Sequence, residues 1–467
     1  MQEKYDAIVI GAGLSGLAAG IRLAMFGKKV CILEKHSIPG GLNSFYQRKG
    51  IQFDVGLHAL TNFAKRGERG LPLTKILKQL RISYDELDLK EQFFSQVAFP
   101  DLSLSFTNNI EFLVEEINKS FPDETDSFLK LVEKVKNFDA FSLDQEFVST
   151  RKILPQYIRD PLLQEMILAP TLAYGSAWEN DVDFSQFVIL FRSIFLEGLS
   201  KPMGGIRKVL ALLEKRFSEN GGILKYKSPV QQIIQNTREV EGVILKNGTI
   251  LKSPTIISSA GFPETMDMVQ DPPPSTMKPK VGTFSFTESI AVLDKKPKEL
   301  GQKAATIFYS SLAKYKYENP KTYYGTETAI LSFPNNFEED PMEQGMARVT
   351  FLANYELWKE LDRASYKKKK EEVFRSSLKL FEKFCPKIED HLILEDVFTP
   401  TTIEKFTNHK RGTIYGSPQK QKRGTTPVKG LILCGTDQGF LGIIGSLLSG
   451  ISMANLHGFS TSQGVNS

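Results

Sequence analysis

Three glycines near the amino terminus have the spacing of a phosphate-binding loop. Gly11, Gly13 and Gly16 follow a short apolar run and open a segment with helical character. The first glycine allows a tight turn, the second lets the backbone approach a phosphate, and the third permits close packing of helix on strand. Because the first helical turn also offers unpaired N–H groups, an anion is favoured there. The whole loop is therefore predicted to bind the diphosphate of a nucleotide through Gly11, Ala12, Gly13, Leu14, Ser15 and Gly16.

A carboxylate stands about twenty residues after this loop, at the end of a second apolar run. Glu34 can accept hydrogen bonds from both hydroxyls of a ribose, and its charge would repel a free 2′-phosphate. The bound nucleotide is therefore expected to be FAD or NAD. The structural alternative is a surface glutamate that merely follows a strand.

Further motifs follow in order along the chain. The amino-terminal part carries Glu34-Lys35, the glycine pair Gly40-Gly41, Asn43-Ser44-Phe45 and the run Phe53-Asp54-Val55-Gly56-Leu57-His58. The middle carries Ser228 to Ile233 and Ile256 to Gly261, and the far end carries Gly430 to Asp437 with a glycine-rich turn behind it. Together they resemble the extended signature of the FAD oxidoreductases that include monoamine oxidases, protoporphyrinogen oxidases and phytoene desaturases.

The resemblance implies that the cofactor is FAD and not NAD. It implies that the segments after the glycine pair and around the DxG motif line the cofactor, that Val230 contacts adenine and that Asp437 accepts a bond from the ribityl chain. The last helix would point its amino terminus at the flavin pyrimidine, where negative charge grows on reduction. Besides the loop and Glu34, the predicted cofactor neighbours are Lys35, Gly41, Leu42, Asn43, Gly56, Leu57, His58, Val230, Ala260, Gly435, Asp437, Ile444 and Gly445.

Three stretches resemble one branch of this superfamily. They are Pro202-Met-Gly-Gly-Ile206, the region from Thr399 to Gly416, and Gly-Leu-Asn-Ser-Phe after the glycine pair. The branch comprises phytoene desaturase, carotenoid isomerase and retinol saturase. It implies an FAD-dependent oxidoreductase that desaturates, saturates or isomerises a lipophilic polyene or isoprenoid of carotenoid or retinoid type.

Other functions of the superfamily stay open as alternatives. Amine oxidases commonly carry an arginine where Leu42 stands, which counts against them, and a protoporphyrinogen oxidase-type enzyme is a further alternative. Prenyl-binding GDP-dissociation inhibitors keep the fold as lipid carriers that use no flavin. The presence of both Glu34 and Asp437 counts against such a carrier.

His58 is the one histidine of five that lies inside a flavin motif. An imidazole near the flavin could exchange a proton with the substrate, which makes His58 a candidate catalytic residue. The alternative is a purely structural histidine. No other catalytic residue is assigned.

The elements that must position these residues follow from the hydrophobic pattern. A strand from Tyr5 to Ile10, a helix to about Phe26 and a strand from Lys29 to Glu34 form a βαβ unit. Helical spacing dominates from about Leu71, in Ile110 to Phe121 and Thr125 to Phe138; a helix follows within Pro202 to Gly222, and short strands follow within Ile223 to Ile257. The segments Ala329 to Phe333 and Arg348 to Leu352 indicate a second sheet, and a basic helix surrounds Lys367 to Lys370.

The predicted fold class is α/β. A discontinuous Rossmann-like FAD domain comprises residues 1–70, 201–265 and 425–467, and an inserted α+β substrate domain comprises residues 71–200 and 266–424. The stretches Gln270 to Pro279 and Ser417 to Pro427 are expected to be passages between domains.

Two apolar segments could each lie either in the protein core or against lipid. Phe184, Phe187, Val188, Phe191 and Phe195 form one helix face, which fits the core of the substrate domain better than a lipid surface. Phe440 to Leu456 resembles a membrane span superficially, but its glycines, serines and Asn455 favour a buried helix.

Composition limits the partners. The net charge of +5, from 59 Lys and Arg against 54 Asp and Glu, is too small to indicate nucleic acid. The three cysteines, Cys31, Cys385 and Cys434, lie far apart, without a metal-ligand spacing, and fit a reducing compartment. Without a signal-peptide pattern, the protein is expected in the cytoplasm. Peripheral association with the inner face of an anionic membrane remains open.

Overall fold

The computed structural model describes residues 3–140, 146–272 and 279–459. Its centre is a five-stranded parallel sheet with the order β10-β3-β2-β14-β20. The strands are β2 (Ala7–Ile10), β3 (Val30–Leu33), β10 (Ile223–Lys225), β14 (Ile256–Ser258) and β20 (Leu431–Leu433). Four of the five strands are buried along their whole length, as expected for apolar strands of a parallel sheet that is covered on both faces.

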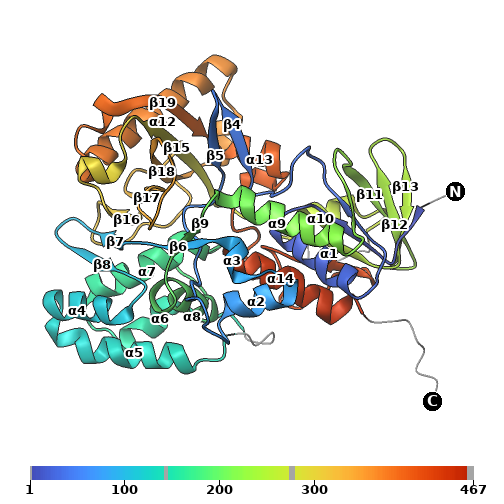
Figure 1. The fold of residues 1–467 in the computed structure, drawn as a ribbon, viewed down its shortest axis with the longest axis horizontal. Coiled ribbons are helices and arrows are strands. Elements are labelled where there is room, and N and C mark those ends of the chain that lie inside the picture. The colour runs from blue at the N-terminus through green and yellow to red at the C-terminus, as the bar shows by residue number, and fades with distance from the viewer. Residues whose placement is uncertain (1–2, 141–145, 273–278, 460–467) are drawn as a thin grey trace.

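One face of this sheet is covered by helices from both ends of the chain. Helix α1 (Leu14–Met25), close to the amino terminus, lies beside α14 (Gly442–His457), close to the carboxyl terminus (Figure 1). The two helices approach closely because Gly450 has no side chain: a Cβ there would lie 2.0 Å from the carbonyl oxygen of Ser15. Helices α9 (Gly205–Glu219), α2 (Pro72–Leu80) and α3 (Tyr84–Leu87) complete this side.

A four-stranded sheet with the order β1-β13-β12-β11 adjoins the parallel sheet. Its strands are β1 (Glu3–Lys4), β11 (Val230–Asn236), β12 (Glu239–Leu245) and β13 (Ile250–Lys252), and α10 (Phe262–Met268) follows β14. A turn at Asn247-Gly248 joins β12 to β13, with Gly248 in the left-handed region. The sequence prediction of short strands between Ile223 and Ile257 is confirmed.

The second large sheet has seven strands in the order β19-β15-β18-β17-β16-β7-β8. They are β7 (Ser95–Ala98), β8 (Ser103–Phe106), β15 (Ser285–Leu293), β16 (Thr306–Ser310), β17 (Thr328–Ser332), β18 (Gly345–Ala353) and β19 (Leu392–Phe398). Small two-stranded sheets pair β4 (Phe45–Arg48) with β5 (Ile51–Asp54) and β6 (Leu89–Glu91) with β9 (Ser200–Pro202). The predicted second sheet is thus present, and the basic run lies on α12 (Arg363–Phe384), which packs on one face of it.

A helical layer lies below this sheet in Figure 1. It contains α4 (Ile110–Ser120), α5 (Thr125–Asn137), α6 (Thr150–Ile153), α7 (Pro161–Gly175) and α8 (Phe184–Phe191), which continues into a π-helical turn, η3 (Arg192–Leu196). The remaining helices are α11 (Tyr355–Lys359) and α13 (Pro400–Thr407), with short 3-10 turns at Pro122–Glu124, Leu154–Gln156, Pro297–Leu300, Ile388–His391 and Lys410–Gly412.

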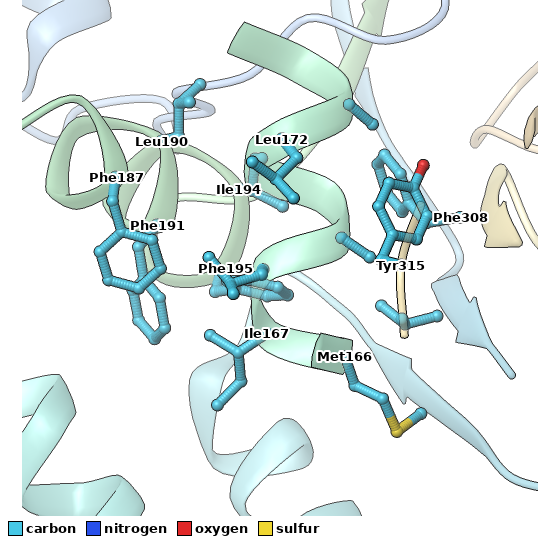
Figure 2. Packing of buried hydrophobic residues seen from close by; sticks show 14 of the residues in the cluster. Met166, Ile167, Leu172, Phe187, Leu190, Phe191, Ile194, Phe195, Phe308 and Tyr315 are labelled. Atoms are coloured by element: carbon cyan, nitrogen blue, oxygen red, sulfur yellow. The ribbon is translucent and has the colours of Figure 1, made fainter. Parts of the chain in front are cut away.

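The phenylalanine face of α8 lies in the core of this layer. Phe187, Phe191 and Phe195 stack along α8 and η3, with ring centroids 5.7 Å and 5.0 Å apart, and pack beside Ile167 of α7 (Figure 2). None of these rings is more than 2% exposed. The interpretation as a core helix is therefore confirmed.

The last apolar segment forms α14, which begins at Gly442. Among the described helices, none has both the length and the apolar character needed to cross a membrane.

Two passages between domains were expected. The first is Gln270 to Pro279, and its residues 273–278 lie outside the described residues. Ser417 begins the other passage, and its N–H bonds to Asp437, so this stretch is tied to the carboxyl-terminal motif.

Candidate active site

The glycine loop forms the turn between β2 and α1, as its spacing predicts. Gly11 has a φ of +94°, and a Cβ on Gly16 would lie 2.1 Å from the carbonyl oxygen of Gly11, so neither position accepts a side chain without displacement. Helix α1 begins after Gly13 with no side-chain cap and no acidic residue in its first turn. The N–H groups of this turn are therefore available to an anionic ligand.

A second glycine segment lies against this turn. The N–H of Gly40 donates to the carbonyl oxygen of Ala12 at 2.9 Å, and a Cβ placed on Gly41 would reach only Gly13 Cα, at 3.8 Å. Gly56 approaches the same segment so closely that a Cβ there would lie 2.4 Å from the carbonyl oxygen of Leu42. Side-chain-free backbone thus lines a continuous cradle, which fits the diphosphate of a dinucleotide.

The two charged residues that follow β3 point in different directions. Glu34 is buried, and its carboxylate accepts hydrogen bonds from the N–H groups of Ala12 and His36, each at 2.8 Å. A carboxylate has about four acceptor sites, so Glu34 can still bind ribose hydroxyls. Lys35 instead extends toward the end of α13, where its Nζ lies 3.3 Å from both the Lys405 carbonyl oxygen and Asn408 Oδ1.

The carboxyl-terminal motif brings Thr436, not Asp437, to the cavity described below. Asp437 is buried, and its carboxylate accepts bonds from the N–H of Phe262 at 2.6 Å and of Ser417 at 2.7 Å. It therefore ties the motif to α10 and to the loop at Ser417. Gly435 has a φ of +85° and lies close to Ser15 of α1. A Cβ added at Gly435 would stand 2.8 Å from Ser15 Oγ.

Ile444 and Gly445 lie in the first turn of α14 and line the cavity. This helix also begins without a side-chain cap and without an acidic residue in its first turn. Two uncapped helix amino termini, those of α1 and α14, thus belong to the predicted cofactor site. Val230 and Ala260 lie apart from the cavity lining, half-buried against the core between β11 and the parallel sheet.

One cavity of about 560 Å³ joins the part of the cradle formed by Gly41 and Gly56 to an apolar chamber; the loop from Gly11 to Gly16 and Glu34 are not among its lining residues. From the cradle side its lining includes Gly41, Leu42, Asn43, Gly56, His58, Thr436, Ile444 and Gly445. On the other side it is lined by Tyr174 of α7, Ile189 and Leu190 of α8, Phe286 and Ile330 of the seven-stranded sheet, and Ile414 and Tyr415 of the loop after the 3-10 turn Lys410–Gly412. This volume lies within the range of small-molecule sites, which are mostly apolar with a few placed polar groups.

A cluster of polar side chains stands where the two parts of the cavity meet. His58 Nδ1 lies 2.8 Å from Ser332 Oγ, and His58 Nε2 lies 3.4 Å from Glu288 Oε2. Arg348 forms an ion pair with the other oxygen of Glu288, and Thr350 Oγ1 donates to Oε2 at 3.3 Å. His58 and Glu288 line the cavity, whereas Arg348 lies behind them and donates to the carbonyl oxygen of Leu57 at 2.8 Å.

Burial changes the proton affinity of this cluster. Burial raises the pKa of the Glu288 carboxyl above its ordinary value, although the adjacent Arg348 guanidinium and its hydrogen bonds act in the opposite direction. Burial, assisted by the charge of Arg348, lowers the pKa of His58 well below its ordinary value. The uncharged imidazole is thus favoured, and protonation of Glu288 becomes easier.

Sequence reasoning found His58 but missed Glu288, Arg348, Thr350 and Thr436. A signal for two of them was present. Glu288 is the only charged residue of β15, and Arg348 is the only one of β18, although every residue of both strands is buried. Because a charge in a fully buried strand needs a partner, two such strands predict an ion pair between them.

Residues 9–79 match the family model of the NAD(P)-binding Rossmann-like domain. This match covers the loop, Glu34 and the DxG segment. This match points to a dinucleotide cofactor, and the α/β class with a Rossmann-like domain is confirmed.

Known proteins resemble the chain over almost its whole length. Prolycopene isomerase 1 of an Oncidium hybrid cultivar is 26% identical, with 97% of this chain and 84% of the relative covered. The all-trans-retinol 13,14-reductase of Danio rerio is 25% identical, with 97% and 86% covered. A solved oxidoreductase from Methanosarcina mazei has the same fold, with a TM-score of 0.66, 17% identity, and 97% of this chain and 100% of that chain covered. The motifs and these matches agree: the chain is a homologue of the prolycopene isomerases and the all-trans-retinol 13,14-reductases.

Proposed function

We propose that this protein is an FAD-dependent oxidoreductase that acts on a lipophilic polyene of carotenoid or retinoid type, by saturation, desaturation or cis/trans isomerisation. One observation carries the proposal: a single cavity joins a backbone cradle suited to a dinucleotide with a chamber walled by apolar and aromatic side chains. Its relatives over nearly the whole chain are named as a carotenoid isomerase and a retinol reductase.

FAD would be held by the residues of the cradle. The first turn of α1, with Gly13 and Gly41, would bind the diphosphate, and Glu34 would bind the ribose of the adenosine. Thr436 and the first turn of α14 would meet the ribityl chain and the flavin ring. FAD, when bound, supplies the exchange of a hydride or an electron pair with a carbon substrate.

The chain's own residues would orient the polyene and exclude water. Tyr174, Phe286 and Tyr415 present aromatic surface to the cavity, and aromatic rings stack favourably on extended π systems. The hydroxyl of Tyr415 donates to the carbonyl oxygen of Ala173, which fixes its ring. Because most of this wall is apolar, the few polar groups beside it would define where the reactive double bond lies.

The alternatives are less well supported. Leu42 stands at the place where amine oxidases commonly carry arginine, and it lines the cavity. A lipid carrier needs no flavin, whereas here Gly11, Gly16 and Gly56 leave no room for side chains around the cradle. Both observations favour a flavin enzyme of the polyene branch.

The test uses the purified holoprotein. It is incubated with a lycopene-type carotene, with retinol and with a simple amine, each with and without a reductant, while flavin absorbance and product mass are followed. We expect a yellow protein that converts a polyene. Bleaching of the flavin by amines alone would refute the proposal, and a colourless folded protein would favour the carrier.

We further propose peripheral attachment to the inner face of a membrane, with the protein in the cytoplasm. Ile38 and Phe406 line the cavity and are 37% and 54% exposed, so they mark its mouth, and Lys405 lies over the Phe406 ring. Apolar residues flanked by lysine are suited to an anionic bilayer surface.

In sedimentation with anionic phospholipid vesicles, Phe406→Ser is expected to weaken binding several-fold. Phe112→Ser, which alters an exposed phenylalanine of α4, is the matched control; equal binding by both variants would refute this attachment site.

A further inference from the structure

Glu288 and His58 are a close pair of ionisable side chains that both line the cavity, with His58 Nε2 3.4 Å from Glu288 Oε2. Glu288 stands on β15, directly opposite Thr350 of β18, and Thr350 in turn stands opposite Ile330 of β17. Directly opposed residues of neighbouring strands share a face of the sheet. The carboxyl group therefore lies on the face that forms the cavity wall.

The surroundings hold both side chains in place. Arg348, two residues before Thr350, lies on the same face and pairs with Glu288, while its guanidinium also bonds to the carbonyl oxygen of Leu57, the neighbour of His58. Ser332 engages the other imidazole nitrogen. Arg348, Thr350 and Ser332 are thus positioning residues for a carboxyl and an imidazole that both face the cavity.

Such an arrangement is costly for the fold. Glu288 and Arg348 are 3% and 1% exposed in the middle of a sheet, and a buried ion pair is often no more stabilising than apolar side chains of the same volume. A proton-transfer function explains why charge is kept at this place. Burial raises the pKa of Glu288 and lowers that of His58, so both shifts favour a proton on the carboxyl over one on the imidazole.

We propose that His58 and Glu288 are a catalytic pair that carries the proton exchanged with the polyene. This inference rests on the proposed function. In the reductive direction, one carbon of the double bond receives a hydride, with its two electrons, from a reduced flavin. The adjacent carbon receives the proton of the pair, and the electrons of the broken π bond form its new C–H bond. The flavin is oxidised by two electrons, the pair regains its proton from water, and the oxidative direction reverses these steps.

The test compares two variants of the pair with a matched control. The variants are Glu288→Gln and His58→Gln. The control is Glu165→Gln, which alters a part-buried Glu–Arg pair, with Arg151, outside the cavity lining. All holoproteins are assayed for flavin content and for reduction of an artificial dye by the reduced flavin. Flavin content is expected to agree among wild type, Glu288→Gln and Glu165→Gln, since neither glutamate is among the cradle residues. Rates of His58→Gln, whose side chain lines the cavity on the cradle side, are compared per bound flavin.

The first readout needs no substrate. Infrared difference spectra are recorded on reducing the flavin of the holoprotein in H2O and D2O, because uptake of a proton by a carboxyl gives a carbonyl band that shifts in D2O. We expect this band in wild type and in Glu165→Gln and its loss in Glu288→Gln. If Glu288→Gln keeps the band, or wild type lacks it, the proposal is overturned.

The second readout is single turnover of a polyene in D2O with reduced flavin. Wild type is expected to place one solvent deuterium on carbon, and both pair variants are expected to slow this step by about a hundredfold or more, the usual contribution of general acid catalysis. If the single-turnover rates of both pair variants lie within about threefold of the rate of the control, the proposal of a catalytic pair is refuted, while the proposed function still holds. If wild type converts no polyene, the proposed function fails, and the infrared band alone decides whether the pair holds a proton.

Discussion

A close approach of α14 to α1 depends on the missing side chain of Gly450. In Gly450→Ala, the new Cβ would lie 2.0 Å from the Ser15 carbonyl oxygen and 3.0 Å from the Ala19 nitrogen, whereas real Cβ atoms essentially never come within 3.0 Å of another heavy atom. Because the obstacle is backbone, one helix must move by about 1 Å, the difference between 3.0 and 2.0 Å. Overpacking of this kind costs about 1–3 kcal/mol.

Alanine is also a better helix former than glycine, which returns up to about 1 kcal/mol. We therefore expect a net loss of about 1–2 kcal/mol in the free energy of unfolding. The same displacement moves the first turn of α14, which lines the cofactor end of the cavity. If the free energy of FAD binding is weakened by a comparable amount, about 1.4 kcal/mol, the Kd for FAD rises about tenfold.

Both quantities are accessible with apoprotein. Unfolding in urea is followed by tryptophan fluorescence, and FAD affinity is measured by titration of flavin fluorescence. The matched control is Gly325→Ala, whose Cβ would meet its nearest neighbour, Glu327, at an ordinary 3.4 Å. If Gly450→Ala has the same unfolding free energy and the same Kd as Gly325→Ala, then the α1–α14 contact does not set the geometry of the site.

Three further predictions concern single side chains. Glu34→Ala leaves the N–H groups of Ala12 and His36 without their acceptor and removes a charged hydrogen-bond partner of about 1.5–3 kcal/mol, so the Kd for FAD is expected to rise about tenfold to a hundredfold in fluorescence titration; an unchanged Kd would contradict the role of Glu34. Phe191→Ala removes a ring that is 0% exposed and is expected to cost about 3–5 kcal/mol in urea unfolding; a loss below about 1 kcal/mol would show that the core collapses around it. Burial raises the pKa of Glu197 from 4.5 to about 7, so the folded state binds the extra proton, and stability falls as the pH rises from below 5 through about 7. The measurement is the free energy of unfolding of wild type minus that of Glu197→Gln, which cannot titrate. This difference is expected to fall by at most about 3 kcal/mol over that pH range; a difference that does not change with pH would contradict the prediction.

Much of the fold could be predicted because local patterns determine it. The turn at Gly11 to Gly16, the strand that ends before Glu34 and the phenylalanine face of α8 all follow from spacing along a single element. The order of the motifs also indicated that both ends of the chain contribute to one dinucleotide region. The resemblance to the polyene branch is confirmed by the relatives that match the chain.

The cavity wall could not be predicted in the same way, because it depends on pairing between distant strands. Glu288 and Arg348 are sixty residues apart and meet only through the register of β15 and β18. Likewise, the sequence could not show that Thr436 lines the cavity while Asp437 bonds to the N–H of Phe262. That depends on the conformation of the turn after β20. The domain boundaries and the cofactor contacts remain predictions.

The parallel sheet has a consequence for the order in which the protein matures. Its last strand, β20, pairs with β14, and α14 follows β20 to cover α1. During synthesis, β14 is therefore an open edge of the sheet, and the cavity lacks one wall, until β20 and α14 have left the ribosome. The proposed FAD would therefore be taken up only after α14 is in place, and it could not serve as a template for the early steps of folding. A supply of free FAD should then raise the yield of mature protein by stabilising a finished structure, and not by accelerating its formation.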